Sequence, residues 1–306
     1  MEIEPDPLPN PDIHPSEPNY IWQEAGNNFV VLNDNDPYDP SGATNQNTNQ
    51  HLAAFLTKAG KSWKSYQEDV DLTTVNGQLT NVPLPQDQWT VPLTSFSGVF
   101  GSGVNQYNGS SQFNYAAKHN PQVFFTDTNG GNDASTANPL STHYASLQQL
   151  PTDLANNTVS DYTRITPDQY HDMHTALSGG YKSLTGDPAK ILQGDDFLSQ
   201  VVPLIMASAA YQNNGVIVIW FDEAESDGVV GDNGDDFNHT IGEIIISPWL
   251  TGTSMACPMR ARSTTRTPQT CAPGKRFSMS GRFCGNAENA TDLSDLFQPG
   301  VIPAKP

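Results

Sequence analysis

The chain has 306 residues, of which 36% are hydrophobic, and its formal net charge at pH 7 is −19. This length fits one large α/β domain or two smaller ones, and the apolar content is enough for a sizeable core. The negative charge argues against a nucleic-acid or anionic-membrane partner, because either surface would repel the chain. It permits a site that collects divalent cations. No stretch approaches the roughly 20 apolar residues that cross a bilayer, so stable membrane insertion is not expected.

The first seventy residues predict an extended start followed by one helix and one strand. Residues 1–19 are rich in proline and are expected to be extended; they lack the positive region and apolar run of a signal peptide. Polar residues 33–50 predict a surface loop. The apolar spacing of 51–56 predicts a helix that stops at Gly60, and 63–70 predicts a short strand followed by a turn.

The rest of the chain predicts an α/β fold. Residues 75–116 are expected to form an irregular insertion, and 122–125 a short buried strand. A helix is expected at 198–213, with one apolar side made of Val201, Val202, Ile205, Met206 and Ala209. The apolar, β-branched run 215–221 predicts a central strand covered on both faces of its sheet, and 243–248 predicts a second such strand.

The segment 253–284 differs in composition from everything before it. It holds 6 of the chain's 14 basic residues, no acidic residue and all three cysteines. A basic tail is the simplest interpretation. The absence of cysteine from the first 256 residues suits an exported protein built without disulfides.

Two adjacent carboxylates, Asp222 and Glu223, directly follow the strand predicted at 215–221. Ligands of open α/β sheets gather beyond the carboxyl ends of the strands, and carboxylate oxygens suit divalent cations. A solvated strand end is the alternative. The acidic loop 225–238 lacks the spacing of a calcium-binding loop, but His239 follows it and could return beside Asp222.

Two other segments carry candidate chemistry. Asp172 and His174 flank Met173, so an extended segment would place both on one side as half of a zinc site. Ser16 lies between two prolines, which would hold a nucleophile exposed in a rigid turn, and the amide of Asn19 could bind phosphoryl oxygens. An ordinary proline-rich loop is the alternative for the second segment.

Taken in order, eight segments resemble the phosphoesterase family that contains acid phosphatases and phosphatidylcholine-type phospholipases C, within the alkaline-phosphatase superfamily. The segments are HPSEPNYIWQEAGNNF, AAFLTKAGKSWKSYQEDV, KHNPQVFF, YHDMHTAL, GDDFL, VIVIWFDE, NHTIGEIIISP and ATDLSDLFQPG. They cover most of residues 14–252 and the last 20 or so.

This resemblance implies a mostly parallel central sheet flanked by helices and a hydrolase acting on small phosphate esters, in a secreted or periplasmic protein. It implies that Ser16 is the nucleophile, that Asn19 binds the phosphoryl group and that His174 acts at the leaving group. It also implies a divalent metal ion, zinc, calcium or another, held by Asp172, Asp222, Glu223 and His239. The reaction would be in-line displacement at phosphorus through a phosphoserine.

Two departures from the family pattern accompany the resemblance. Members normally open with a strand that ends in a further metal ligand, and only 15 residues precede Ser16, so the first strand is expected to be missing. Members also continue differently over 253–284, and a back-translation of residues 267–278 with permissive codons can read as family-like sequence when the frame is moved by one nucleotide. We therefore expect a phosphoesterase domain over 1–252, a frame-shifted segment over 253–284 and the end of the same domain over 285–306.

Other functions remain open from the sequence. Gly252–Pro258 matches the nucleophile motif of subtilisin-like proteases, but none of the seven histidines is followed by glycine, as that family's histidine motif requires. An impaired or inactive family member and a phospholipase C-type phosphodiesterase are further alternatives. Substrate and oligomeric state cannot be derived from the sequence.

Overall fold

The computed structural model describes residues 15–76, 78–81, 115–130, 138–174, 177, 179–222, 243–250 and 297–298. The chain divides into two compact units. The first comprises residues 1–34, 50–52 and 214–306, and the second comprises 35–49 and 53–213. The domain boundaries expected at 252/253 and 284/285 lie outside the described residues.

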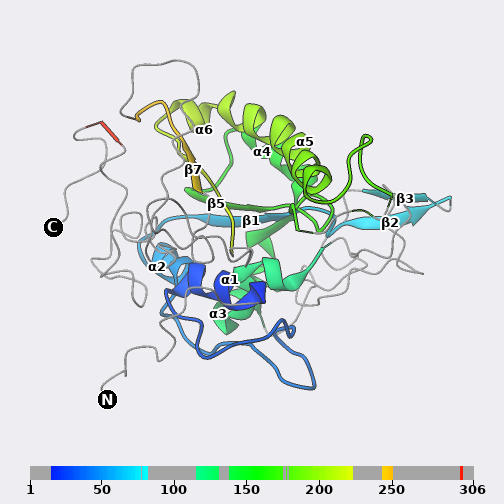
Figure 1. Cartoon of the computed structure of the whole chain (residues 1–306). Helices are drawn as coiled ribbons and strands as arrows, with labels where there is room; N and C mark the ends of the chain where they lie inside the picture. Colours follow the sequence, from blue (N-terminus) through cyan, green and yellow to red (C-terminus); the bar gives the residue numbers. More distant parts are fainter. Residues whose placement is uncertain are drawn as a thin grey trace, which may run out of the picture. The chain divides into compact units, whose positions relative to one another are not determined.

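The second unit is built on a parallel three-stranded sheet, which confirms the α/β class (Figure 1). Its order is β4–β1–β5, formed by Tyr144–Ser146, Trp63–Gln67 and Tyr162–Thr166. Trp63 pairs with Tyr162 and Gln67 with Thr166, so β1 and β5 end side by side. The strand predicted at 63–70 is confirmed as β1, and its buried aromatic residues are typical strand formers.

Helices α4 (Leu150–Ala155) and α5 (Asp187–Met206) cover one face of this sheet (Figure 1). Side chains alternate between the two faces of a strand, and that of Tyr66 lies on the face covered by α4 and α5. It belongs to a buried cluster with Leu147, Leu150, Leu154 and Phe197, against which Val201 and Ile205 pack. Two members of the predicted apolar side of this helix, Val201 and Ile205, are therefore confirmed.

The opposite face of the sheet is covered by short 3₁₀ helices at Ala117–His119 and Pro121–Phe124. Here the contacts are polar: Ser65 donates a hydrogen bond to Asn120 (3.0 Å), and Thr166 donates to the His119 carbonyl (3.2 Å). The strand predicted at 122–125 is wrong, although the segment is buried as expected. Pro121 at the first helical position favours a helical turn, and short apolar runs do not distinguish strand from helix by periodicity.

Other elements of this unit follow local signals. Helix α2 (Leu52–Lys58) matches the prediction, and the chain reverses at Gly60, where φ is +69°. The unit also contains α3 (Thr126–Asn129), α6 (Ala209–Gln212) and the hairpin of β2 (Leu72–Val75) and β3 (Gln78–Asn81).

The helix predicted at 198–213 has different limits in the structure. It begins at Asp187 and stops at Met206, and a new turn starts at Ala209. The break occurs because Ser208 is extended and its hydroxyl accepts a hydrogen bond from the Tyr211 N–H (3.2 Å), as an N-cap does. Met206 is therefore exposed rather than part of the apolar side.

The first unit contains α1 (Ser16–Ala25) and the pair β6 (Ile217–Trp220) and β7 (Glu243–Ile246). Both predicted strands exist, but they pair with each other in antiparallel register, and their residues are only partly buried. Within the described ranges β6 therefore has one strand neighbour and half-buried residues, which does not confirm a central strand covered on both faces. The extended start predicted over 1–19 is wrong from Ser16 onward, where α1 begins.

No helix among the described residues is both long enough and apolar enough to cross a membrane.

Candidate active site

Ser16 and Asn19 lie one turn apart in the first part of α1. Pro15 is extended and ends the non-helical chain, so Ser16 is the first helical residue. Residues three apart share one face of a helix, which brings the two side chains together as the resemblance requires. Ser16 is 6% exposed and Asn19 is 3% exposed. The expected exposed serine in a rigid turn is thus corrected to a buried serine at a helix start, where the helix dipole favours anions.

The same unit fixes α1 by two further polar contacts. The N–H of Glu17 donates to Asp34 (3.1 Å). At the other end of the helix, the Nδ1 of His51 lies 3.0 Å from Glu24, with both side chains buried. These contacts hold both ends of the helix that carries Ser16.

Asp222 lies two residues beyond the end of β6, after Phe221, and one of its carboxylate oxygens is buried. Glu223 and His239 lie outside the described residues. Asp222 is therefore the one expected metal ligand of the first unit that lies among the described residues.

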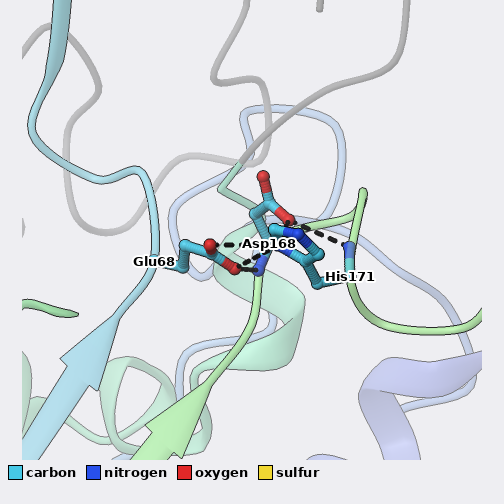
Figure 2. A group of neighbouring side chains, drawn as sticks. All are labelled: Glu68, Asp168 and His171. Atoms are coloured by element: carbon cyan, nitrogen blue, oxygen red, sulfur yellow. Dashed lines mark hydrogen bonds and ion pairs between the residues drawn. The ribbon is translucent and has the colours of Figure 1, made fainter. Parts of the chain in front are cut away.

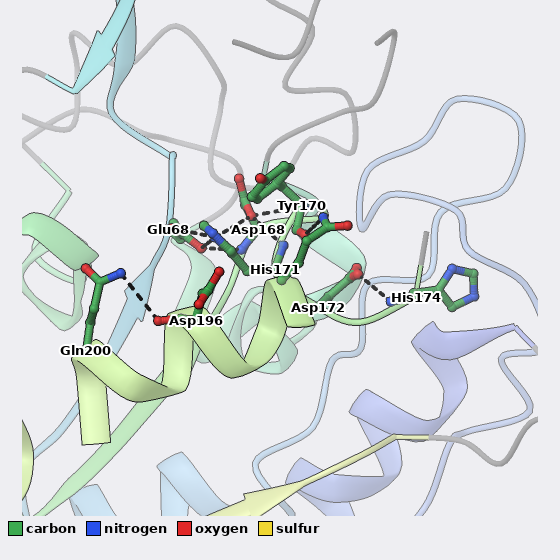
Figure 3. Close-up of polar contacts among 9 residues, drawn as sticks. Glu68, Asp168, Tyr170, His171, Asp172, His174, Asp196 and Gln200 are labelled. Carbon is green, nitrogen blue, oxygen red and sulfur yellow. Dashed lines mark hydrogen bonds and ion pairs between the residues drawn. The ribbon is translucent and has the colours of Figure 1, made fainter. Parts of the chain in front are cut away.

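Asp172 and His174 belong to the second unit, in the loop between β5 and α5 (Figure 3). The loop is a tight turn at this point, with Met173 at a φ of +67°. Oδ1 of Asp172 accepts a hydrogen bond from the N–H of His174 (2.8 Å), and the side chain of His174 is exposed. The expected extended segment is therefore wrong, because the Asp172 carboxylate closes the turn on its own backbone.

Helix α5 packs closely against this turn. Gln193 is fully buried and donates to the carbonyl of Tyr170 (2.6 Å). Gly194 has no side chain, and a Cβ there would lie 2.3 Å from the Cε and 2.4 Å from the Cγ of Met173. Glycine at this position is what allows the helix to approach the loop that carries Asp172 and His174.

A group of three side chains lies at the carboxyl ends of β1 and β5 (Figure 2). Glu68 directly follows β1, Asp168 lies two residues after β5, and His171 begins the next turn. The Nδ1 of His171 lies 3.0 Å from Glu68 and 3.2 Å from Asp168. Glu68 also accepts a hydrogen bond from the N–H of Asp168 (2.9 Å), which ties the two strand ends together.

The electrostatics of this group follow from its burial and charge. Burial raises the pKa of Asp168, and the nearby charge of Glu68 raises it further. Burial alone would lower the pKa of His171, but hydrogen bonds to the carboxylates of Asp168 and Glu68 raise it overall. The buried His119 behaves oppositely: burial, and then neighbouring positive charges, lower its pKa to about 3, so it is neutral.

The sequence interpretation missed Glu68 and Asp168 and treated His171 only as a neighbour of Asp172. A signal was present, because acidic residues lie within two residues of the end of each strand, at 68–69 and at 168. Ligands gather at strand ends, and the sequence favours the end of 215–221 because its apolar run is the longest. The strands that form the parallel sheet are more polar, WKSYQ and YTRIT, and were less conspicuous.

The donor types present in each unit fit a divalent cation, since carboxylate oxygens and imidazole nitrogens are common ligands of such ions. In the second unit the ligand atoms of Glu68, Asp168 and His171 lie within 4.8 Å of one another.

Comparison with known proteins places this chain in a family. The model of the phosphoesterase family matches residues 10–257. A probable acid phosphatase of Kluyveromyces lactis is 26% identical over 193 residues, which cover 63% of this chain and 37% of that protein. An acid phosphatase of Aspergillus fumigatus is 27% identical over 197 residues, which cover 63% of this chain and 35% of that protein.

The aligned region therefore spans little more than a third of the length of either relative. Because the family match extends over most of the chain, from before the nucleophile candidate to beyond β7, the chain belongs to the phosphoesterase family.

Proposed function

We propose that this protein hydrolyses phosphate monoesters in the manner of an acid phosphatase, with Ser16 as the nucleophile. The family match over residues 10–257 carries this proposal. It is supported by α1, which holds Ser16 and Asn19 one turn apart at a helix start. A helix start presents the positive end of the helix dipole to a phosphoryl group.

In the proposed reaction, the Oγ of Ser16 attacks phosphorus and the ester oxygen leaves as an alcohol. His174 donates the proton that the leaving oxygen needs, and Asn19 hydrogen-bonds the phosphoryl oxygens. Water then cleaves the phosphoserine and releases inorganic phosphate. A divalent ion held by Asp172, Asp222, Glu223 and His239 would supply positive charge that lowers the pKa of the hydroxyl and of the attacking water.

A phosphodiesterase of the phospholipase C type and an impaired family member are the alternatives. Both share the family match, so turnover must separate them. The protease alternative has less support, because the family match points elsewhere; its motif at 252–258 lies outside the described residues. By the same resemblance we propose that the protein is exported, and that 253–284 arose from two compensating frameshifts, which resequencing the gene would test.

The experiment is hydrolysis of p-nitrophenyl phosphate and bis-p-nitrophenyl phosphate, each with and without a chelator. We expect chelator-sensitive turnover of the monoester; preference for the diester would favour the phospholipase-type alternative, and no turnover the impaired one. Ser16→Ala should abolish turnover, whereas Ser199→Ala, an exposed serine on α5, should not change it. A serine-directed protease inhibitor should have no effect.

Asp222→Asn tests the metal assignment separately. It removes ligand charge at the end of β6 and leaves the shape of the side chain unchanged. We expect loss of phosphatase activity with the fold retained. Near-normal turnover in this variant, with metal still bound, would refute the role of Asp222.

A further inference from the structure

The cluster of Glu68, Asp168 and His171 in the second unit contains none of the residues used in the proposed reaction. Its three ligand atoms come from the ends of two adjacent parallel strands and from the turn that follows (Figures 2 and 3). Strand pairing fixes the first two positions, since Gln67 and Thr166 are register partners. The N–H groups of Tyr170 and His171 both donate to Oδ1 of Asp168 (3.0 Å each), and these two hydrogen bonds fix the position of His171. The arrangement is therefore built by backbone geometry.

Negative charge is in excess at this place. Glu68 is 8% exposed and Asp168 is 1% exposed. Asp69, also 1% exposed, has its carboxyl within hydrogen-bonding reach of Asp168. The imidazole of His171 contacts both Glu68 (3.0 Å) and Asp168 (3.2 Å), and one imidazolium balances the charge of only one of these two carboxylates. Buried carboxylates are costly unless they are paired or coordinate a metal.

One buried acceptor atom of the cluster also lacks a hydrogen-bond donor among the described residues. Oδ2 of Asp168 is inaccessible to solvent and has no N–H or O–H donor within the described part of the chain. Buried polar atoms in native proteins are almost always satisfied by protein, water or an ion. The oxygen of Asp168 that faces His171 is Oδ1, so Oδ2 is an additional buried acceptor on the same carboxylate, and a cation at the site would add positive charge beside it.

We propose that Glu68, Asp168 and His171 bind a divalent transition-type metal ion such as zinc at the carboxyl ends of β1 and β5. The distances of 3.0 and 3.2 Å from His171 Nδ1 to the two carboxylates suit such an ion. Ligand atoms each about 2.05 Å from a tetrahedral metal lie about 3.3 Å from one another. An imidazole ligand favours zinc-like ions over calcium and magnesium, which take oxygen ligands.

This site does not depend on the proposed phosphatase activity, because it is defined by binding and shares no ligand with the residues assigned to the reaction. Its bound ion would join β1 to the loop that carries Asp172 and His174. The ion would therefore also order that loop, since Asp172 directly follows His171.

The test is to titrate Zn²⁺ into the metal-stripped full chain by calorimetry and to determine the bound equivalents by elemental analysis. Glu68→Gln and His171→Gln should each lose one equivalent relative to the wild type. The matched control is Glu24→Gln, which breaks a buried His–carboxylate contact of the same 3.0 Å length, with His51, away from the cluster in the sequence. It should keep the full stoichiometry.

Asp222→Asn separates this site from the proposed catalytic metal. That variant should keep the equivalent that Glu68→Gln loses, whatever its phosphatase activity. Unchanged zinc binding in both Glu68→Gln and His171→Gln would overturn the proposal and would leave the cluster as an ion pair of His171 with its carboxylates.

X-ray absorption on zinc-loaded Asp222→Asn requires no change at the cluster, so the result does not depend on how the cluster variants fold. The expected first shell is one imidazole nitrogen with oxygen ligands. A shell without imidazole, or with two or more imidazoles, would contradict the assignment.

Discussion

Replacing Tyr66 by Phe tests how the sheet is held to α4. The Tyr66 side chain is fully buried, and its hydroxyl donates to Oδ2 of Asp153 at 2.5 Å. The substitution keeps the ring in the cluster and creates almost no cavity, so the cost is that of one hydrogen bond to a charged group, about 1.5–3 kcal/mol. Asp153 retains contacts from Gln149 (3.1 Å) and Lys64 (3.3 Å), which places the expected cost near 1.5 kcal/mol.

Tyr144→Phe is the matched control. Its hydroxyl donates to a neutral acceptor, the Thr128 carbonyl, at 2.8 Å, so its loss should cost about 0.5–1.5 kcal/mol at every pH. Urea denaturation of both variants, with hydrogen exchange at the β1 amides to assign the transition to this unit, gives the two free energies of unfolding. A smaller cost for Tyr66→Phe than for Tyr144→Phe at pH 7 would refute the reasoning.

The pH dependence of the Tyr66→Phe effect follows from Asp153. Burial would raise the pKa of this carboxyl, but hydrogen bonds from Tyr66 and Gln149 and the charge of Lys64 lower it overall. A carboxyl with a lowered folded-state pKa stabilises the fold above its unfolded pKa, about 3.9, and that stabilisation is lost as pH falls through the folded value. The difference between the two variants should therefore be full at pH 7 and shrink below pH 4. A difference independent of pH would contradict the assignment to Asp153.

Two glycine substitutions test the turns around the site. Gly194→Ala places a Cβ against Met173 and 3.0 Å from the His171 carbonyl, so it should displace the 171–174 turn and lower kcat for p-nitrophenyl phosphate at least several-fold; Gly179→Ala, with open space around it, should not. Gly130→Ala adds a side chain at a φ of +68° and 2.1 Å from the Asn138 amide, so it should cost more than about 1 kcal/mol of unfolding free energy in urea. Full activity in the first variant or unchanged stability in the second would show that these contacts are absent.

The elements that the sequence predicted well are those with strong local signals. The helix before Gly60 and the strand at Trp63 have clear periodicity and punctuation, and both are present. The run 215–221 was recognised as a strand, but its environment was not. A continuous apolar run does not show which neighbours bury it, and among the described residues β6 pairs with β7 alone.

The candidate site could be predicted only in part. Resemblance proposes Ser16 and Asn19 as site residues, and α1 places them one turn apart. The expected zinc half-site of Asp172 and His174 assumed an extended chain, whereas a side chain-to-backbone hydrogen bond turns the segment. Periodicity arguments do not register such local competition between side chain and backbone.

Glu68 and Asp168 escaped prediction for a different reason. They lie a hundred residues apart and meet only because β1 and β5 are register partners. Strand pairing of this kind cannot be derived from one sequence, and each acid alone is indistinguishable from a solvated loop residue. The two carboxylates are close together because of long-range strand pairing, which composition and local spacing do not reveal.

Phosphoserine trapping tests the central claim most directly. The full chain is incubated with p-nitrophenyl phosphate, quenched in acid, which preserves a phosphoserine, and digested for mass spectrometry. We expect phosphate on Ser16 in the wild type and none in Ser16→Ala, with chelator-treated protein also unlabelled. A phosphoenzyme trapped at any other residue, or turnover that persists in Ser16→Ala, would contradict the account.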